Sequence, residues 1–179
     1  MPLPVAHGLV GAGVVAAFHP QPFRRKGLPL FVGAVVANCA DLDFGLVLLT
    51  HDKSLHRSFT HSLVFSLLLT LTALAVCGWA HLRRVLVYGA AYTSHGLLDY
   101  STTKFGGGVK LFWPFSDERM GLRLWGVSEL PSRLPLLALL KWLAVEFIIF
   151  APPLLLLLLL RAYYSKDRRT GSDGSRVPV

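Results

Sequence analysis

Carboxylate and imidazole side chains are concentrated in one stretch of an otherwise apolar sequence. Asp41 and Asp43 are separated by one residue, and His56 and His61 follow them, on either side of Arg57. Carboxylate oxygens and imidazole nitrogens suit Zn²⁺, Mn²⁺ and similar divalent ions. The segment 41–61 therefore predicts a metal site.

A second possible source of ligands lies further along the chain. His95 and Asp99 are four positions apart, so a helix would present both on one face, one turn apart. The alternative is a hydrogen-bonded pair that closes a helix end. Two separate clusters with compatible ligands are stronger evidence for a metal site than either cluster alone.

The spacing within the first cluster restricts its local structure. A continuous helix would point Asp41 and Asp43 in different directions, so we expect a helix end or turn there, and Asp41 could instead cap a helix. The five-residue separation of His56 and His61 does not fit one helical face. We expect His56 in a loop and His61 at the entry of a helix that Thr60 or Ser58 could cap. Carboxylates within apolar sequence are costly unless they are used, which favours the metal interpretation.

The composition indicates a membrane protein. Of 179 residues 53% are hydrophobic, and the mean hydropathy is +0.53. The apolar runs 62–80 and 134–160 are long enough to cross a bilayer, and shorter runs occupy 5–18, 28–40 and 85–98. We expect an all-α polytopic integral membrane bundle with about five membrane-embedded helices. A soluble protein with buried helices is disfavoured because little polar face remains to cover them.

The net charge of +8 does not indicate nucleic-acid binding, because the basic residues lie at the ends of apolar runs. Under the positive-inside rule, 24–26, 83–84 and the tail from Arg161 should be cytoplasmic. We therefore expect a membrane-embedded domain over 1–164 and a disordered basic cytoplasmic tail over 165–179. This topology leaves His19 and His81 inside. It places the candidate ligands together on the extracytoplasmic side: His7, Asp41, Asp43, His56, His61, His95 and Asp99.

An aromatic and basic segment follows the second cluster. Lys110, Trp113 and Arg119 belong to it. Aromatic rings beside cations suit the headgroup level of a membrane, so a plain interfacial anchor and a substrate-binding loop both fit.

The order of these motifs resembles a known family. An early His, Asp-x-Asp after an apolar run, His-Arg-x-x-x-His-Ser, His-x-x-x-Asp and Leu-x-Trp-Pro-Phe-Ser are similar to the bacterial YdjM-like inner-membrane metal-dependent hydrolases, over residues 5–119. The resemblance implies a multi-pass inner-membrane enzyme whose metal site is formed by the seven candidate ligands. A more distant similarity is to zinc-dependent phospholipase C and the P1-type nucleases. Because a second downstream His-x-x-x-Glu or Asp motif is missing, we expect one or two metal ions, Zn or Mn, rather than three.

The predicted activity is hydrolysis of a phosphoester in a lipid or lipid-linked substrate by metal-activated water. Asp43 or Asp41 would act as general base, and Arg57 would neutralise oxyanion charge. Lys110 and Arg119 would meet phosphate, with Trp113 at the acyl boundary.

The lipid expectation rests on the three short apolar runs. Each forms about 20 Å of helix against a hydrocarbon core of about 30 Å, which would place the site in a recess that lipid can enter. The expected partners are membrane lipids. The alternative function is a non-catalytic metal-binding or metal-transporting membrane protein; the substrate and the oligomeric state stay open.

Overall fold

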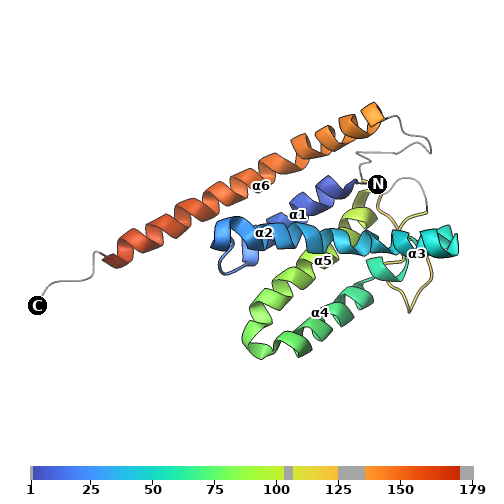
Figure 1. Ribbon diagram of the computed structural model, residues 1–179, viewed down its shortest axis with the longest axis horizontal. Coiled ribbons are helices and arrows are strands. Elements are labelled where there is room, and N and C mark those ends of the chain that lie inside the picture. Colours follow the sequence, from blue (N-terminus) through green and yellow to red (C-terminus); the bar gives the residue numbers. More distant parts are fainter. Residues whose placement is uncertain (1, 103–106, 125–135, 174–179) are drawn as a thin grey trace, which may run out of the picture.

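The regular structure of the chain is helical (Figure 1). The computed structural model describes residues 2–102, 107–124 and 136–173. Within these residues the only extended pairing is an isolated bridge between Val109 and Met120, so the all-α expectation is confirmed. The α-helices of the described part are α1 (Pro4–Phe18), α2 (Arg24–Asn38), α3 (Asp43–Thr50), α4 (Leu63–Cys77), α5 (Leu82–Thr102) and α6 (Leu136–Asp173). The 3-10 helices are η1 (Cys39–Leu42), η2 (Lys53–Leu55), η3 (Phe59–His61) and η4 (Trp79–His81).

Fewer helices can cross a membrane than the sequence predicts. By length and composition, Gly27–Thr50 and Leu136–Tyr164 are candidate spans among the described residues. A third exists if Lys53–His61 and Leu63–Cys77, which are bent by 54°, count as one span. The expectation of about five membrane-embedded helices is therefore wrong in number. The 15 residues of α1 give about 22 Å of helix, less than the hydrocarbon core of about 30 Å.

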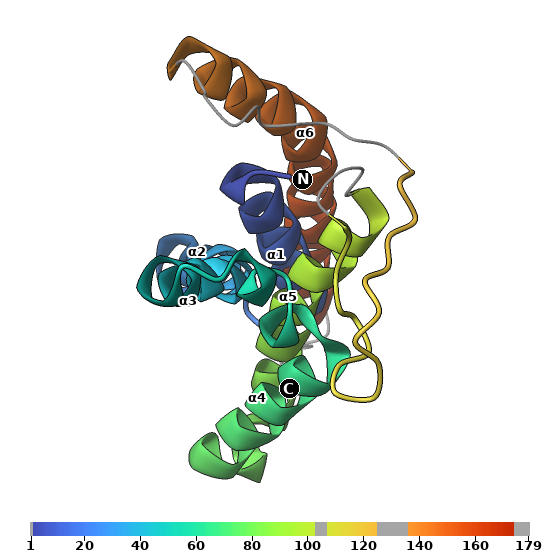
Figure 2. The same cartoon turned by 90° about the vertical axis from the view of Figure 1, so that its right-hand side faces the viewer.

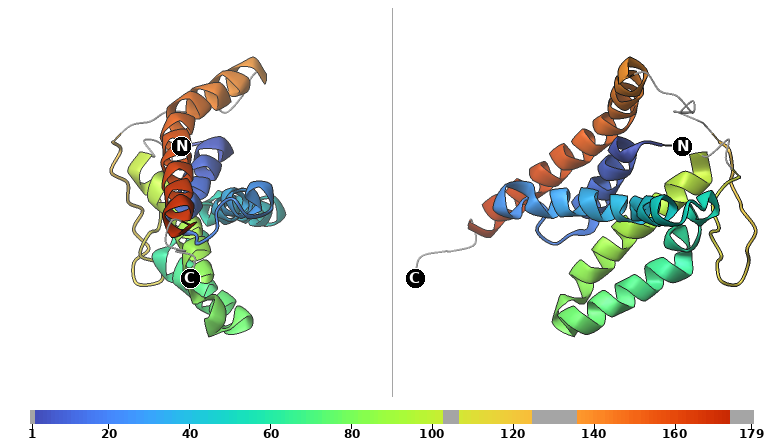
Figure 3. Two further views of the ribbon diagram at one scale, coloured as in Figure 1. Left: turned by 90° about the vertical axis from the view of Figure 1, so that its left-hand side faces the viewer. Right: turned by 45° about the vertical axis from the view of Figure 1, so that its right-hand side comes forward.

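Helix α1 lies at the centre of the bundle, in contact with α2, α5 and α6. The views agree that α6 lies on one side of α1 and α4 on the other side (Figures 2 and 3). Helix α5 lies between α1 and α4. Where α1 meets α2, a Cβ added to Gly11 would lie 2.6 Å from the Gly33 carbonyl oxygen and 2.4 Å from the Ala37 Cβ. Only glycine allows this approach, which is a common way for membrane helices to pack closely.

A buried carboxylate joins α6 to the start of α1. Glu146 is fully buried, and its carboxylate accepts hydrogen bonds from the backbone N–H groups of Leu3 and Ala6. The first N–H groups of a helix have no partner within the helix, and a negative charge is favourable there. Glu146 therefore caps α1 from another helix, beside His7.

The C-terminal end of α6 differs from the expectation for 165–179. Residues 165–173 continue the helix where the sequence predicts disorder, and 174–179 lie outside the described residues. Adding a residue to an existing helix costs far less than starting one, and Arg and Lys are good helix formers. The basic composition of the tail therefore did not prevent helix formation.

Candidate metal centre

The structure brings the candidate ligands together where α1, η1, η3 and α5 meet. Three sets offer ligand atoms that all lie within 4.8 Å of one another: His7, His95 and Asp99; Asp41, His61 and His95; and Asp41, Asp43 and His56. His95 and Asp41 each belong to two of the sets, so the three sets form one continuous group. We call this group the His–Asp cluster.

The spacing of the central atoms fits a shared cation. The Asp41 Oδ1 atom lies 3.3 Å from His95 Nε2 and 3.5 Å from His61 Nε2. The His7 Nε2 atom lies 3.5 Å from Asp99 Oδ1. Tetrahedral ligands with bonds of about 2.1 Å to a zinc ion are separated by about 3.4 Å. The measured separations therefore match ligands around a metal ion better than direct hydrogen bonds.

The inward-facing atoms of the cluster lack other partners. The Nε2 atoms of His7, His61 and His95 and the Oδ1 atom of Asp41 are buried without a hydrogen-bond partner in the described part of the chain. Buried polar atoms without partners are costly and rare, so several of them aimed at one point need an explanation. The overlapping sets of ligands mean that one or two divalent cations would satisfy these atoms, and the residues present fit the metal that the sequence implies.

Hydrogen bonds on the far side of three imidazoles orient these ligands. The Nδ1–H of His95 donates to the Ala37 carbonyl oxygen at 2.7 Å, and that of His61 donates to Thr60 Oγ1 at 2.9 Å. The Nδ1–H of His56 donates to Asp43 Oδ1 at 2.9 Å. A carbonyl or carboxylate oxygen only accepts, and the Thr60 hydroxyl already donates its proton to Asp43. These partners therefore put the proton on Nδ1 and leave the Nε2 lone pair for a metal.

Asp43 is buried, and both of its oxygens have partners. Besides the bond from His56, Asp43 Oδ2 accepts hydrogen bonds from the Arg57 N–H at 3.0 Å and the Thr60 hydroxyl at 2.9 Å. This arrangement orients the residues around it. The role of Asp43 as ligand and base stays a prediction, whereas Asp41 offers an oxygen without a partner.

Arg57 is buried at the edge of the cluster. Its Nε atom lies 3.2 Å from Asp99 Oδ2, and its backbone is left-handed with φ 56°. Its positive charge therefore lies next to a candidate metal ligand.

Close packing of η3 on α5 brings His61 to the cluster. A Cβ added to Gly96 would lie 2.4 Å from the His61 carbonyl oxygen, so glycine is needed there. The Tyr92 hydroxyl donates to the Thr60 carbonyl oxygen at 2.8 Å. Neither contact is predicted by the sequence, which suggests Thr60 only as a helix cap. In the structure Ser62, not Thr60, caps α4. The position of Thr60 directly before His61 was the available signal.

The three predicted substrate-binding residues lie beside the His56 segment and form internal contacts. Arg119 donates to the carbonyl oxygens of Ser54 at 2.7 Å and His56 at 3.1 Å. Lys110 pairs with Asp117 at 2.7 Å, and Trp113 contacts Phe59 with ring centroids 5.8 Å apart. Arg119 thus holds this loop in place, and the predicted contacts of all three with substrate stay predictions.

The remaining histidines lie outside the cluster. His51 and His81 are exposed. His19 lies in the loop after α1, where burial lowers its pKa and its carbonyl oxygen accepts a hydrogen bond from Arg161 at 2.8 Å.

Comparison with known proteins gives two matches. The sequence model of the YdjM inner membrane protein family matches residues 1–169. Inner membrane protein YbcI of Escherichia coli (strain K12) is 37% identical over 97 residues, which are 50% of this chain and 56% of that protein. The match thus spans about half the length of that relative. No solved structure matches the chain.

Proposed function

The chain belongs to the YdjM inner membrane protein family, and we propose that it is a metal-dependent hydrolase that cleaves a phosphoester in a lipid or lipid-linked substrate. The family and the apolar helices support a location in the inner membrane. The observation that carries the proposal is the convergence of buried imidazole nitrogens and a carboxylate oxygen that have no hydrogen-bond partner in the described residues.

The donor set favours zinc, with manganese as the next choice. Imidazole nitrogen together with carboxylate oxygen suits both ions, and the described cluster offers no thiolate. Because Asp41 and His95 link three overlapping sets of ligands, the cluster has donors for one or two ions.

A bound divalent ion would lower the pKa of a water molecule and polarise the scissile group. Asp41 could accept the proton through its second oxygen while Oδ1 binds the ion, because its side chain is 16% exposed and so open to water. Arg57 supplies positive charge for the developing oxyanion. Asp43 keeps His56 and the backbone of Arg57 in position.

We place the cluster on the extracytoplasmic side of the membrane. Arg83 and Arg84 begin α5, whereas His95 and Asp99 lie in its last turns. Arg161 lies near the end of the candidate span Leu136–Tyr164 and contacts the loop after α1, away from the start of α1 that carries His7. The positive-inside rule then puts these basic ends in the cytoplasm.

The proposal is tested by assaying purified protein in detergent with phospholipids and isoprenoid phosphates. We expect release of phosphate or headgroup that requires a divalent ion, and a loss of about 100-fold or more in His61→Ala. His81→Ala removes an exposed histidine and should keep full activity. Turnover of only water-soluble esters or peptides, with no reaction or competition by lipids, would contradict the proposed substrate.

A non-catalytic metal-binding role is the second candidate. It is favoured by the closure of the cluster, since the side chains of His7, His61 and Asp99 are 0% exposed. Stoichiometric metal binding without turnover of any ester would support this role over hydrolysis.

A further inference from the structure

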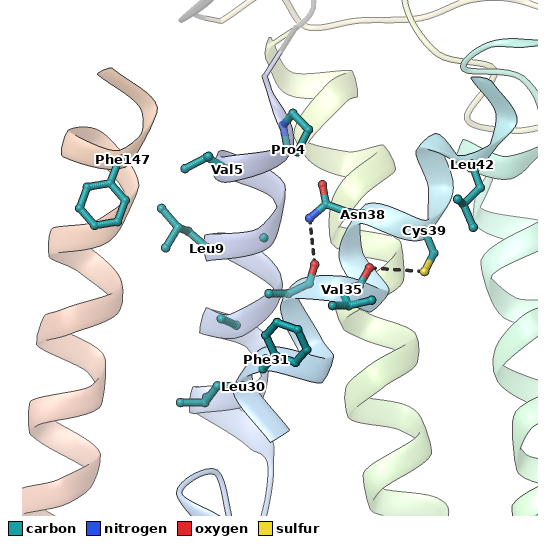
Figure 4. A pocket seen from close by; sticks show the side chains of 13 residues that line it. Pro4, Val5, Leu9, Leu30, Phe31, Val35, Asn38, Cys39, Leu42 and Phe147 are labelled. Carbon is teal, nitrogen blue, oxygen red and sulfur yellow. Dashed lines mark hydrogen bonds between the residues drawn. The ribbon is translucent and has the colours of Figure 1, made fainter. Parts of the chain in front are cut away.

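An apolar groove runs along α1 between the two candidate spans. It has a volume of about 690 Å³, within the range of about 300–1,000 Å³ that is typical of ligand sites. Leu9 of α1, Phe31 and Val35 of α2 and Phe147 of α6 line its length (Figure 4). Its walls therefore belong to helices that would lie within the bilayer.

One end of the groove reaches the element that carries Asp41. Cys39 and Leu42, the first and last residues of η1, line the groove, and Asp41 of the same short helix belongs to the cluster. On α1, Pro4 and Gly8 line the groove, and His7 lies between them in the sequence. The groove and the cluster thus share two elements.

The exposure of the cluster shows where a ligand can enter. The side chains of Asp41 and His56 are each 16% exposed, whereas those of His7, His95 and Asp99 are 0% exposed. A substrate group can therefore reach the cluster at Asp41 or His56, and of these two Asp41 belongs to η1, whose first and last residues line the groove.

Asn38 marks the transition between the apolar and polar parts. Its Nδ2 donates to the Ala34 carbonyl oxygen at 2.9 Å, as Figure 4 shows. Its Oδ1 is buried without a hydrogen-bond partner among the described residues. The cluster end of the groove thus carries a polar side chain whose acceptor has no internal partner in the described residues.

We propose that the groove holds one hydrocarbon chain of the lipid substrate, with the polar end of that lipid at Asp41. The assignment rests on the proposed function and specifies how the same site recognises its substrate. Lipid is the favoured occupant because two of the three walls, α2 and α6, belong to candidate spans, so hydrocarbon chains would surround the opening. Within a bilayer, burying apolar surface contributes little free energy to the association of two proteins, because the lipid chains are equally apolar.

The test uses the full chain in vesicles that contain a phospholipid with a diazirine near the end of one acyl chain. After irradiation, mass spectrometry maps the adducts. We expect more adducts on the groove residues of α1 and α2 than on exposed apolar residues of α4. Val35→Trp fills the groove and should lower the groove adducts about tenfold, the effect of losing contacts with about two methylene groups.

Val76→Trp is the matched control. Val76 is an exposed valine of α4 outside the groove, and the same substitution there should leave the groove adducts unchanged. Evenly spread adducts that do not respond to Val35→Trp would overturn the groove assignment. Crosslinking between the Cys39 residues of two copies, with few adducts in the groove, would overturn it in favour of a second copy of the chain.

This readout is independent of turnover. Groove adducts without lipid hydrolysis would contradict the proposed function and leave a lipid-binding groove. Lipid hydrolysis with evenly spread adducts would contradict the groove alone.

Discussion

Thr60 connects two members of the cluster through one hydroxyl group. The hydroxyl donates to Asp43 and accepts the Nδ1–H of His61, while its carbonyl oxygen accepts a hydrogen bond from Tyr92. The direction of the His61 Nε2 lone pair therefore depends on a residue that is not itself a candidate ligand. Such supporting contacts commonly have a large effect on metal affinity.

Thr60→Val keeps the shape of the side chain and removes both hydroxyl contacts. We expect metal affinity to fall about 10–100-fold with the helical content unchanged. Competition with a chelator of known affinity measures the change. Thr50→Val is the control, because the Thr50 hydroxyl donates to the Leu46 carbonyl oxygen and accepts from the Asp52 N–H, and neither group belongs to the cluster. Equal affinity in the two variants would show that Thr60 does not orient His61.

The ligands could be proposed from the sequence because their residue types and order are informative. The contacts that hold these ligands in place could not be predicted. The Ala37 carbonyl that fixes His95 leaves no pattern in the sequence, since every residue has a carbonyl. The sequence also does not show that Asp41 has an oxygen without a partner whereas both oxygens of Asp43 accept hydrogen bonds. This difference arises only in the folded chain.

Helix α1 carries a single candidate ligand, His7, and two contacts determine where that ligand lies. The glycine contact with α2 sets how close the helix approaches, and Glu146 of α6 holds its first turn. Both contacts link the two candidate spans to the cluster through a helix that is itself too short to span. We therefore expect changes at either contact to weaken metal binding.

Gly11→Ala should destabilise the protein by about 1–3 kcal/mol, because its Cβ would overlap the Ala37 Cβ and the Gly33 carbonyl oxygen. Gly13→Ala is the matched control in the same helix, since a Cβ there meets nothing within 4 Å. Thermal unfolding in detergent compares the two variants. A similar melting temperature for both would contradict the close crossing of α1 and α2.

Glu146→Leu removes the acceptor of the Leu3 and Ala6 N–H groups. We expect about 10-fold or greater loss of metal affinity, transmitted through His7. A double-mutant cycle with His7→Ala tests whether Glu146 acts through His7. In the His7→Ala background, Glu146→Leu should lower metal affinity little further. An equal further loss in the His7→Ala background would mean that Glu146 acts on the whole fold instead.

At the scale of the molecule, the class of fold was predictable and the number of spans was not. Apolar runs of 13 or 14 residues do not distinguish a spanning helix from a short one. The sequence also suggested that Asp41 and Asp43 interrupt the second run. In the structure, η1 contains Asp41 and leads directly into α3, which begins at Asp43, so Gly27–Thr50 is one candidate span.

The proposed orientation in the membrane predicts different labelling at two positions. With Cys39 and Cys77 replaced, Ser54→Cys should react with a membrane-impermeant thiol reagent on intact cells, because η2 would face outward. Ser172→Cys should be protected until the cells are lysed. Labelling at position 172 with protection at position 54 would invert the topology.

Binding of a divalent metal ion by the His–Asp cluster is tested by the metal content of purified protein, measured by elemental mass spectrometry. We predict one or two zinc or manganese ions per chain in the wild type and in His81→Ala. We predict that His95→Ala and Asp99→Ala each lose most of the metal while still inserting into the membrane. Wild-type metal content in both cluster variants, or no metal in the wild type after supplementation, would contradict the account.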